Sequence, residues 1–344
     1  MRLEVVNPLS HPGWDDLLLA SGGGSFFHSS AWARVLHESY GYTPLYFTSF
    51  AGGRIETLVP VMEIDSPLTG KRGVSLPFTD YCDPIIPESA DAGDVVGQII
   101  TYGKSAGWRH FEFRGDISLP PETPASEAYY GHVLDISRDV NTLLSALRDS
   151  TRRNIRKAGK EGVRVGISGS RDSVEEFYRL HCVTRKLHGV PPQPYRFFRK
   201  IHEHCICAGY GTVAIARHEG RAVAGGVYFH FGGGAIYKYG ASVAAMRRLR
   251  ANNLVMWEAI RHYADLGCAR FCMGRTDADD PGLLQFKRGW GASPHAIRYY
   301  RYDIAAGAYV KTPSALHGLH NKVLAGMPVP VLRLAGSLLY RHVG

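Results

Sequence analysis

The sequence has 344 residues, and its 45% hydrophobic and 21% charged composition excludes a disordered chain and favours two folded domains. Its formal net charge of +9 favours an anionic partner such as tRNA, a nucleotide-linked substrate or an acidic membrane face, although an ordinary solvated surface is an alternative. Without an apolar run of roughly 18 residues or a signal-peptide pattern, we expect a cytoplasmic protein.

The first part of the chain predicts a helix, a hairpin and a second helix. Ser29 or Ser30 precedes an amphipathic segment, and these hydroxyl residues are typical N-caps. Gly52 and Gly53 separate two β-branched, aromatic stretches, as a hairpin turn requires. The expected elements are a helix over 29–39, strands over 45–50 and 55–64, and a helix over 92–106.

The second part predicts more helices around a similar hairpin. Ser173 and Glu176 have the spacing of a capping box at a helix start. The run Gly232-Gly233-Gly234 is interpreted as a hairpin turn. The expected elements are helices over 141–160, 173–187, 195–208 and 253–266, and strands over 212–216, 222–231, 235–242 and 296–303.

The two halves repeat one plan at long spacing. Each has a hairpin with glycine at the bend, followed by a helix end, a glycine stop and a short strand. This order resembles the plan of the GNAT acyltransferase fold, so we expect an α+β (mixed αβ) protein with two tandem GNAT-like domains. The expected parts are an N-terminal lobe over 1–140, a C-terminal lobe over 141–310, and a tail over 311–344 that packs on the second lobe or lies at a membrane interface.

Four segments resemble the Fem family of aminoacyltransferases, which add amino acids from aminoacyl-tRNA to peptidoglycan precursors. They are FFHSSAWARVLHESYGYTP, SLPFTDYCDPII, LRDSTRRNIRKAGKEGVRV and GLLQFKRGWGA, in that order between Phe26 and Tyr302. The coiled-coil arm of some Fem members is absent, which places the chain among the compact ones. The sequence also resembles Fem-like GNAT proteins of exopolysaccharide assembly.

The candidate catalytic residues follow from acyl transfer to an amine, which needs an activated donor and a group that stabilises the oxyanion. The resemblance implies that Phe286 walls the site and that Lys287 supplies positive charge. An alternative is that Lys287 is one of several cations on an exposed loop. Asp80 is a candidate for taking the proton of the acceptor amine, although its segment is also typical of a plain turn.

Two groups of cations are candidates for binding phosphate. Arg152, Arg156 and Lys160 align on one helix face, and their mutual repulsion favours a tRNA backbone or, alternatively, a solvated surface. The candidate tRNA-binding residues are Arg152, Arg153, Arg156, Lys157 and Lys160. Arg247, Arg248 and Arg250 precede a helix start, where an anion binds well. Their loop, AAMRRLRANN, lacks the glycines of coenzyme A-binding GNAT loops, which argues against acetyl-CoA as the donor.

The remaining candidates are weaker. Possible contacts for the acceptor are Arg34, Tyr81, Asp83, Arg196, Lys238 and Tyr239. The cluster His202, His204, Cys205 and Cys207 falls in an expected helix, where the i, i+2 spacing points ligands apart, so we expect no metal site.

Together, these features predict an aminoacyltransferase of the Fem type, which uses aminoacyl-tRNA as co-substrate and needs no other cofactor. Its acceptor would be an amine of a peptide, a cell-wall precursor or a small molecule. The alternatives are an N-acyltransferase that uses a coenzyme A thioester in envelope or exopolysaccharide biosynthesis, and a non-catalytic Fem-like binding protein. We expect a monomer that acts in the cytoplasm, with a peripheral contact to the inner membrane face as a further option.

Overall fold

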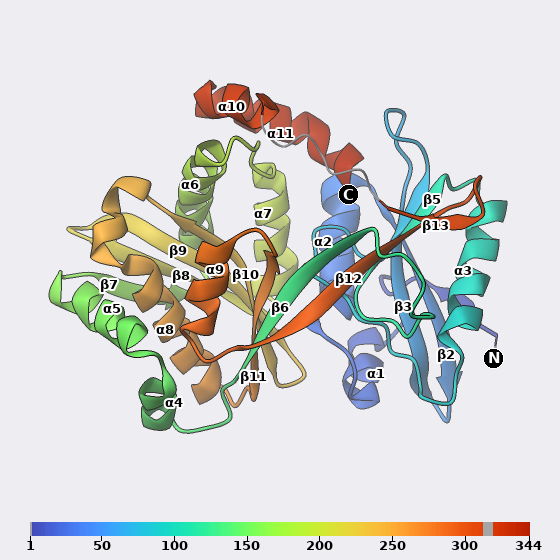
Figure 1. Ribbon diagram of the computed structural model, residues 1–344, viewed down its shortest axis with the longest axis horizontal. Helices are drawn as coiled ribbons and strands as arrows, with labels where there is room; N and C mark the ends of the chain where they lie inside the picture. The colour runs from blue at the N-terminus through green and yellow to red at the C-terminus, as the bar shows by residue number, and fades with distance from the viewer. Residues whose placement is uncertain (1, 312–318) are drawn as a thin grey trace. The chain divides into compact units, whose positions relative to one another are not determined.

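The computed structural model describes residues 2–311 and 319–344 (Figure 1). The chain forms two compact units. Unit 1 comprises Met1–Tyr130, Ala296–Ser314 and Leu339–Gly344, and unit 2 comprises Gly131–His295 and Ala315–Leu338. These units do not coincide with the expected boundaries after residues 140 and 310, because both units contain segments distant in sequence.

Unit 1 contains a mostly antiparallel sheet with the strand order β1-β2-β3-β4-β5-β12, and β13 pairs with β12. Its strands are β1 (Glu4–Val6), β2 (Thr43–Ala51), β3 (Arg54–Ile64), β4 (Arg72–Val74), β5 (His110–Arg114), β12 (Ser293–Asp303) and β13 (Ala308–Val310). Its helices are α1 (Trp14–Ser21), the short 3-10 turn η1 (Phe26–His28), α2 (Ser30–Tyr40) and α3 (Ala92–Ser105). Strand β12 begins in unit 2 and continues into unit 1.

The local signals of unit 1 act as the sequence predicts. Ser29 caps α2, and its side chain accepts a hydrogen bond from the backbone N–H of Trp32. Gly52 and Gly53 take φ values of 55° and 73°, so the β2–β3 hairpin turns through two left-handed residues. Val95 and Ile99 lie one turn apart on α3 and pack into the core with residues of β2, β3 and β5.

His28 is a buried histidine that holds the start of α2 to a distant loop. Its Nδ1 accepts a hydrogen bond from the backbone N–H of Ser25 at 3.1 Å, so its Nε2 carries the hydrogen and donates to the carbonyl of Asp83 at 2.9 Å. Burial lowers the pKa of His28 to about 4, so the ring is neutral at pH 7.

Within unit 2 the strand order is β6-β11-β10-β9-β8-β7, with both parallel and antiparallel pairs. Its strands are β6 (Glu127–Asp135, which begins in unit 1), β7 (Arg164–Ser168), β8 (Gly211–His218), β9 (Arg221–Phe231), β10 (Gly234–Ser242) and β11 (Arg270–Asp277). Its helical segments are α4 (Val140–Ala146), α5 (Asp149–Lys160), α6 (Arg171–Leu187), α7 (Tyr195–Ile201), η2 (His202–Ile206), η3 (Ala244–Leu249), α8 (Ala251–Asp265), α9 (Pro281–Arg288), α10 (Leu319–Gly326) and α11 (Val329–Val343, whose last turn belongs to unit 1).

Helices cover both faces of the unit 2 sheet. On β9, Ala224 belongs to the core cluster that contains α5 and α8. The next residue, Gly225, faces Phe177 of α6, so a side chain at that position would contact the other layer. Because neighbouring residues of a strand point to opposite faces, α8 and α6 pack on opposite sides of the sheet. The predicted hairpins are confirmed, with Gly220 and the pair Gly232-Gly233 at their turns.

The single helix predicted over 141–160 is wrong, because the chain forms two helices there. Leu147 is extended (ψ 148°) and separates α4 from α5. The N–H of Arg148 donates to the carbonyl of Gly289 at 3.1 Å, and the hydroxyl of Thr151 donates to the same carbonyl at 3.0 Å. These long-range hydrogen bonds replace the helical ones at the break.

Two other local predictions need correction. The cap of α6 is Ser170, whose side chain accepts from the N–H of Ser173, and Glu176 forms an ion pair with Arg217 in place of a capping box. Where one α-helix was expected over 195–208, the chain forms α7 over Tyr195–Ile201 and then the π-helical segment η2 over His202–Ile206.

The tail forms α10 and α11, which are separated near Pro328 as the sequence predicts. Residues 312–318 of the predicted tail lie outside the described residues. In unit 2, α11 packs closely against Pro192. A Cβ added at Gly336 would lie only 2.0 Å from the carbonyl oxygen of Pro192, so this position has no room for a side chain. The last turn belongs to unit 1, where the hydroxyl of Tyr42 donates to the carbonyl of Tyr340 at 2.9 Å. No helix in the described parts of the chain has the length and apolar character needed to cross a membrane.

Candidate functional site

The central strands of unit 2 separate at their carboxyl ends. Strands β10 and β11 are parallel, and they pair only where Gly234–Ile236 lies beside Arg270–Cys272. Beyond this point β10 continues to Ser242 and β11 to Asp277. Lys238 is the extra residue of a bulge in β10, a device often found beside active sites. Ligands of open αβ sheets bind outside the carboxyl ends of such strands, so this opening is the candidate site.

The N-terminus of α8 forms the wall of a cavity of about 210 Å3. The loop before it ends at Arg250, which takes a left-handed conformation (φ 57°) that usually favours glycine. The first N–H groups of a helix have no partner within the helix, and the helix dipole adds positive potential there. The cavity is lined by Val223, Ser242, Val243, Met246, Arg247, Arg250, Ala251, Asn252, Asn253 and Phe286. The arginines and the helix N-terminus suit an anionic group, and the apolar lining residues suit an apolar group attached to it.

The structure thus brings three of the predicted residues to one cavity. Arg247 and Arg250 come from the loop before α8, and Phe286 comes from α9. Arg248 is exposed and does not line this cavity. Sequence reasoning missed Asn252 and Asn253, although two polar residues in the first turn of a helix after a basic loop are a signal for an anion site.

Lys287 is buried, with 2% of its surface exposed, so the alternative of an exposed loop is wrong. It lies on α9, which begins after Asp280, whose side chain accepts from the N–H of Leu283. Its Nζ donates to the carbonyl oxygens of Gly274 at 2.7 Å and of Arg275 at 2.9 Å. Both carbonyls belong to the part of β11 that has separated from β10. A fixed ammonium group therefore lies at the opening between the strands.

The basic helix α5 presents most of its cations to solvent. Thr151, Ile155 and Ala158 form its buried face. Arg152 pairs with Asp149 and donates to the carbonyl of Ser145 at 2.9 Å, so it serves the local structure. The other four predicted tRNA-binding residues are exposed: Arg153, Arg156, Lys157 and Lys160.

The remaining predicted residues of unit 2 differ in burial. Tyr239 is buried among aromatic rings, as expected for a core residue. Its ring centroid lies 5.4 Å from that of Phe198 and 6.1 Å from that of His181. Lys238 is half-buried with its Nζ 5.3 Å from the ring centre of Tyr239. Arg196 is exposed on α7.

In unit 1 the loop after β4 carries Asp80, Tyr81 and Asp83. The backbone is held in place, because the hydroxyl of Tyr299 donates to the carbonyl of Asp80 at 2.6 Å. The carboxylate of Asp83 accepts from the N–H of Asp116 at 2.6 Å, which is a structural role.

The same loop contains two non-glycine residues with left-handed backbones, Leu76 (φ 53°) and Phe78 (φ 62°). Such strained residues persist only where the surroundings hold them, and they are frequent at functional sites. Asp80 and Tyr81 are half-buried at the end of this strained segment. Arg34 is half-buried on α2 in the same unit.

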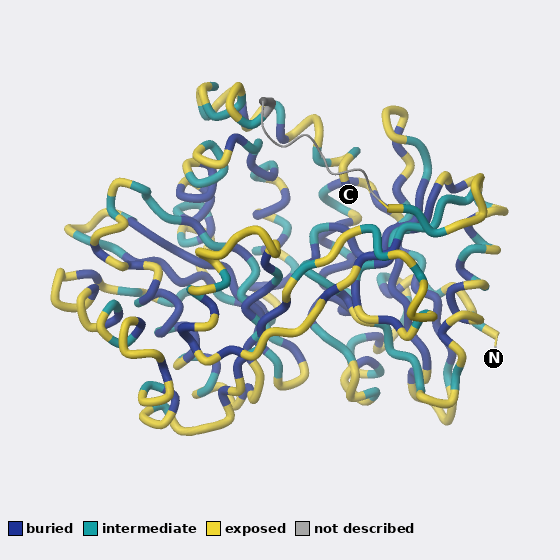
Figure 2. Tube along the Cα trace, viewed as in Figure 1, coloured by how far each residue is buried: buried dark blue, intermediate teal, exposed yellow. Residues whose placement is uncertain are grey.

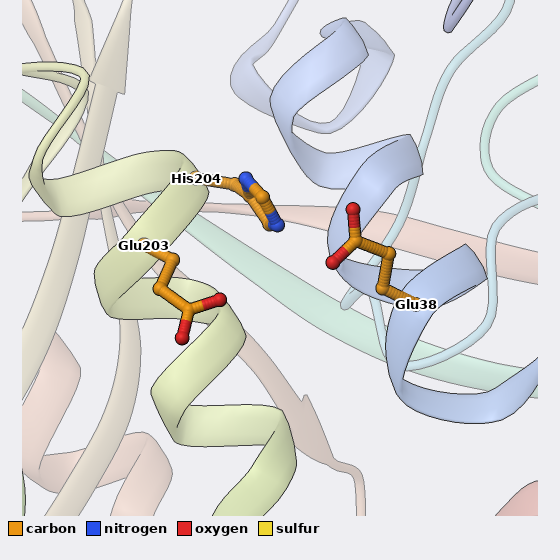
Figure 3. Close-up of side chains that lie close together, drawn as sticks. All are labelled: Glu38, Glu203 and His204. Carbon is orange, nitrogen blue, oxygen red and sulfur yellow. The ribbon is translucent and has the colours of Figure 1, made fainter.

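The histidine and cysteine residues of the η2 turn have different surroundings. Cys205 is buried, whereas Cys207 is exposed and has its Sγ 3.7 Å from Nε2 of His202. Glu203, beside His204 on the same turn (Figure 3), forms ion pairs with Lys200 at 2.6 Å and with Arg199 at 3.5 Å.

Comparisons with known proteins find an acetyltransferase domain within unit 2. Residues 145–288 match the family model described as an acetyltransferase (GNAT) domain. A UDP-N-acetylmuramoylpentapeptide-lysine N(6)-alanyltransferase from Weissella viridescens is 23% identical over 45% of this chain and 47% of its own length. The chain therefore spans about half the length of this curated relative.

Two solved structures share the fold. The crystal structure of FemX has a TM-score of 0.65 at 12% identity and covers 87% of this chain and 97% of its own. A tandem GNAT protein from the clavulanic acid biosynthesis pathway has a TM-score of 0.54 at 11% identity, covering 88% of this chain and 98% of its own. The predicted fold of two tandem GNAT-like lobes is confirmed. Residues 145–288 are thus similar to a GNAT acetyltransferase domain, and the chain shares its fold with FemX.

Proposed function

We propose that this chain is an aminoacyltransferase of the Fem type, which transfers an amino acid from aminoacyl-tRNA to an amine of a peptide, cell-wall precursor or small-molecule acceptor. The observation that carries the proposal is the buried ammonium group of Lys287, held by two carbonyls of β11 next to Phe286 of the α8 cavity. The name of the Weissella relative, an alanyltransferase that acts on a lysine amine, supports the reaction class.

The reaction needs no enzyme nucleophile, because the ester of aminoacyl-tRNA is already activated. The neutral acceptor amine attacks the ester carbonyl, a C–N bond forms, and the bond to the 3′-oxygen of tRNA breaks. The amine loses a proton, and the departing 3′-oxygen takes one up. Negative charge develops first on the carbonyl oxygen and then on the 3′-oxygen. In our proposal Lys287 stabilises this charge, since a cation fixed before the reaction costs no reorganisation at the transition state.

The donor end of the site is assigned to the cations of unit 2. Arg247 and Arg250 at the start of α8 would bind a phosphate near the 3′ end of the tRNA. The exposed face of α5 would bind phosphates further along, beginning with Arg156 and Lys160. Arg250 occupies a left-handed backbone position that glycine adopts more readily, and the loop AAMRRLRANN lacks the glycines of coenzyme A-binding GNAT loops. The missing glycines favour tRNA over coenzyme A as the donor.

Asp80 and Tyr81, the residues predicted to take the proton of the acceptor amine and to orient the acceptor, lie in unit 1 after the strained residues Leu76 and Phe78, and their roles stay predictions. Arg34, on α2 of the same unit, would contact the phosphate of a nucleotide-linked acceptor. Asp83 is assigned to loop structure, because its carboxylate already accepts the N–H of Asp116.

A transfer assay with purified protein tests the proposal. Radiolabelled aminoacyl-tRNAs and labelled acetyl-CoA are offered in parallel, with cell-wall precursor and small amines as acceptors. We expect label in the acceptor from aminoacyl-tRNA, abolished by prior RNase treatment and lost in Lys287→Ala but retained in Arg288→Ala, its exposed neighbour. Label from acetyl-CoA alone would refute the tRNA donor. Binding of precursor without transfer from either donor would indicate a non-catalytic protein.

A further inference from the structure

Helix α11 has two opposite apolar faces, only one of which is buried. Leu332 and Gly336, one turn apart, face the rest of unit 2. Val331, Leu334 and Leu338 lie at i, i+3 and i+7 on the other face, and they are 48%, 62% and 61% exposed. The exposed colouring along this helix is visible in Figure 2. Packing within the chain therefore explains one face of α11 and leaves a row of large apolar side chains in solvent.

The charged side chains of α10 and α11 all have one sign. Arg341 follows Leu338 by one turn on the same helix, so it borders the apolar row. Lys322 lies on α10 next to Val323, which is 63% exposed. The sequence from Leu319 to Gly344 contains no Asp or Glu. A helix with an apolar row, flanking cations and no carboxylate has the composition of a segment that lies in the surface of an anionic bilayer.

We infer that α10 and α11 dock the protein on an anionic lipid surface, with Val331, Leu334 and Leu338 inserted at the boundary of headgroups and acyl chains. The 15 residues of α11 are too few to cross a bilayer, so the helix would lie in the plane of the membrane. Lys322 and Arg341 would contact the lipid headgroups, each adding attraction that salt screens. This inference is independent of the transfer reaction, since none of these residues lines the α8 cavity.

Vesicle co-sedimentation with the full chain tests the docking. Vesicles of phosphatidylcholine alone are compared with vesicles that contain about 30% phosphatidylglycerol, because the attraction depends on anionic lipid. The test variant is Leu334→Asp with Leu338→Asp. The matched control is Leu266→Asp, which changes a leucine of similar exposure (55%) elsewhere in unit 2. A charge variant, Lys322→Gln with Arg341→Gln, tests the cations, and circular dichroism with thermal unfolding checks that each variant is folded.

We expect binding to the anionic vesicles only, at least about tenfold weaker in the double aspartate variant and unchanged in Leu266→Asp. The charge variant should bind several-fold more weakly, and wild-type binding should fall as salt is raised from about 0.1 M to 0.5 M. Equal binding to neutral vesicles, no binding, or retained binding in the folded double aspartate variant would overturn the inference. So would a wild-type dimer in light scattering that becomes monomeric in the double aspartate variant, because the row would then join two copies of the chain.

Discussion

Replacing Lys287 with methionine separates the structural role of its ammonium group from its proposed role in stabilising charge during the reaction. The substitution keeps an unbranched side chain of similar length and removes the donor to the carbonyls of Gly274 and Arg275. Each of the two hydrogen bonds from this charged group contributes about 1.5–3 kcal/mol, and relief of the buried charge offsets part of that, so we expect a net loss of about 3 kcal/mol. For an m-value of about 2–3 kcal/mol/M in urea, the unfolding midpoint should fall by about 1–1.5 M.

The same substitution should lower the transfer rate by about 10²–10³-fold per folded molecule, the cost of removing one preorganised group that stabilises developing charge. Urea titration followed by circular dichroism gives the stability, and single-turnover transfer from labelled aminoacyl-tRNA without denaturant gives the rate. Arg288→Met, on the exposed side of α9, should change the stability by less than about 0.5 kcal/mol and leave the rate unchanged. A Lys287→Met protein that is less stable but transfers at the wild-type rate would refute the catalytic role and leave Lys287 as a structural link between α9 and β11.

Three further predictions follow from other parts of the structure. Because burial lowers the pKa of His28 to about 4, the unfolded chain binds the proton first as pH falls below about 6.5. The contribution of His28 to the free energy of unfolding should therefore decrease by about 3 kcal/mol between pH 6.5 and 4, and denaturant titrations of His28→Gln should show a shallower overall decrease over that range. Gly336→Ala should release α11 from unit 2, detected as faster limited proteolysis, whereas Gly326→Ala, whose Cβ would have no neighbour within 4 Å, should not. Arg156→Gln with Lys160→Gln should weaken tRNA binding in a filter assay and reduce the slope of log affinity against log salt by about 0.7 per lost phosphate contact; an unchanged slope would exclude α5 from the tRNA site.

Local sequence signals predicted the hairpins and several helix limits correctly, because the deciding contacts are within a few residues. Gly52 and Gly53 adopt positive φ values at no steric cost, and this alone places the turn between β2 and β3. Ser29 caps α2 through a hydrogen bond to a residue three positions on. The GNAT plan of unit 2 followed from the order of such elements.

The features that the sequence did not reveal depend on distant partners. The break at Leu147 is stabilised by hydrogen bonds to the carbonyl of Gly289, which lies more than 130 residues further along the chain. Lys287 lies in a helix of eight residues, too short for its apolar spacing to identify the inward face. Its acceptors are backbone carbonyls of β11, which carry no residue-type signal. The roles of Lys287, Phe286 and Asp80 in the reaction stay predictions.

The division of unit 1 into separated segments determines the order in which the chain can fold during synthesis. The main segment of unit 2, Gly131–His295, is continuous and is synthesised before Ala296–Ser314. Until then β5 pairs with β4 alone, because its other partner is β12, where Tyr299 and Asp303 pair with Arg114 and His110. The earlier-made N-terminal residues therefore finish folding last, with one edge of their sheet open in the nascent protein. For the same reason, no single cut in the gene separates the two units, and neither can be exchanged as one cassette.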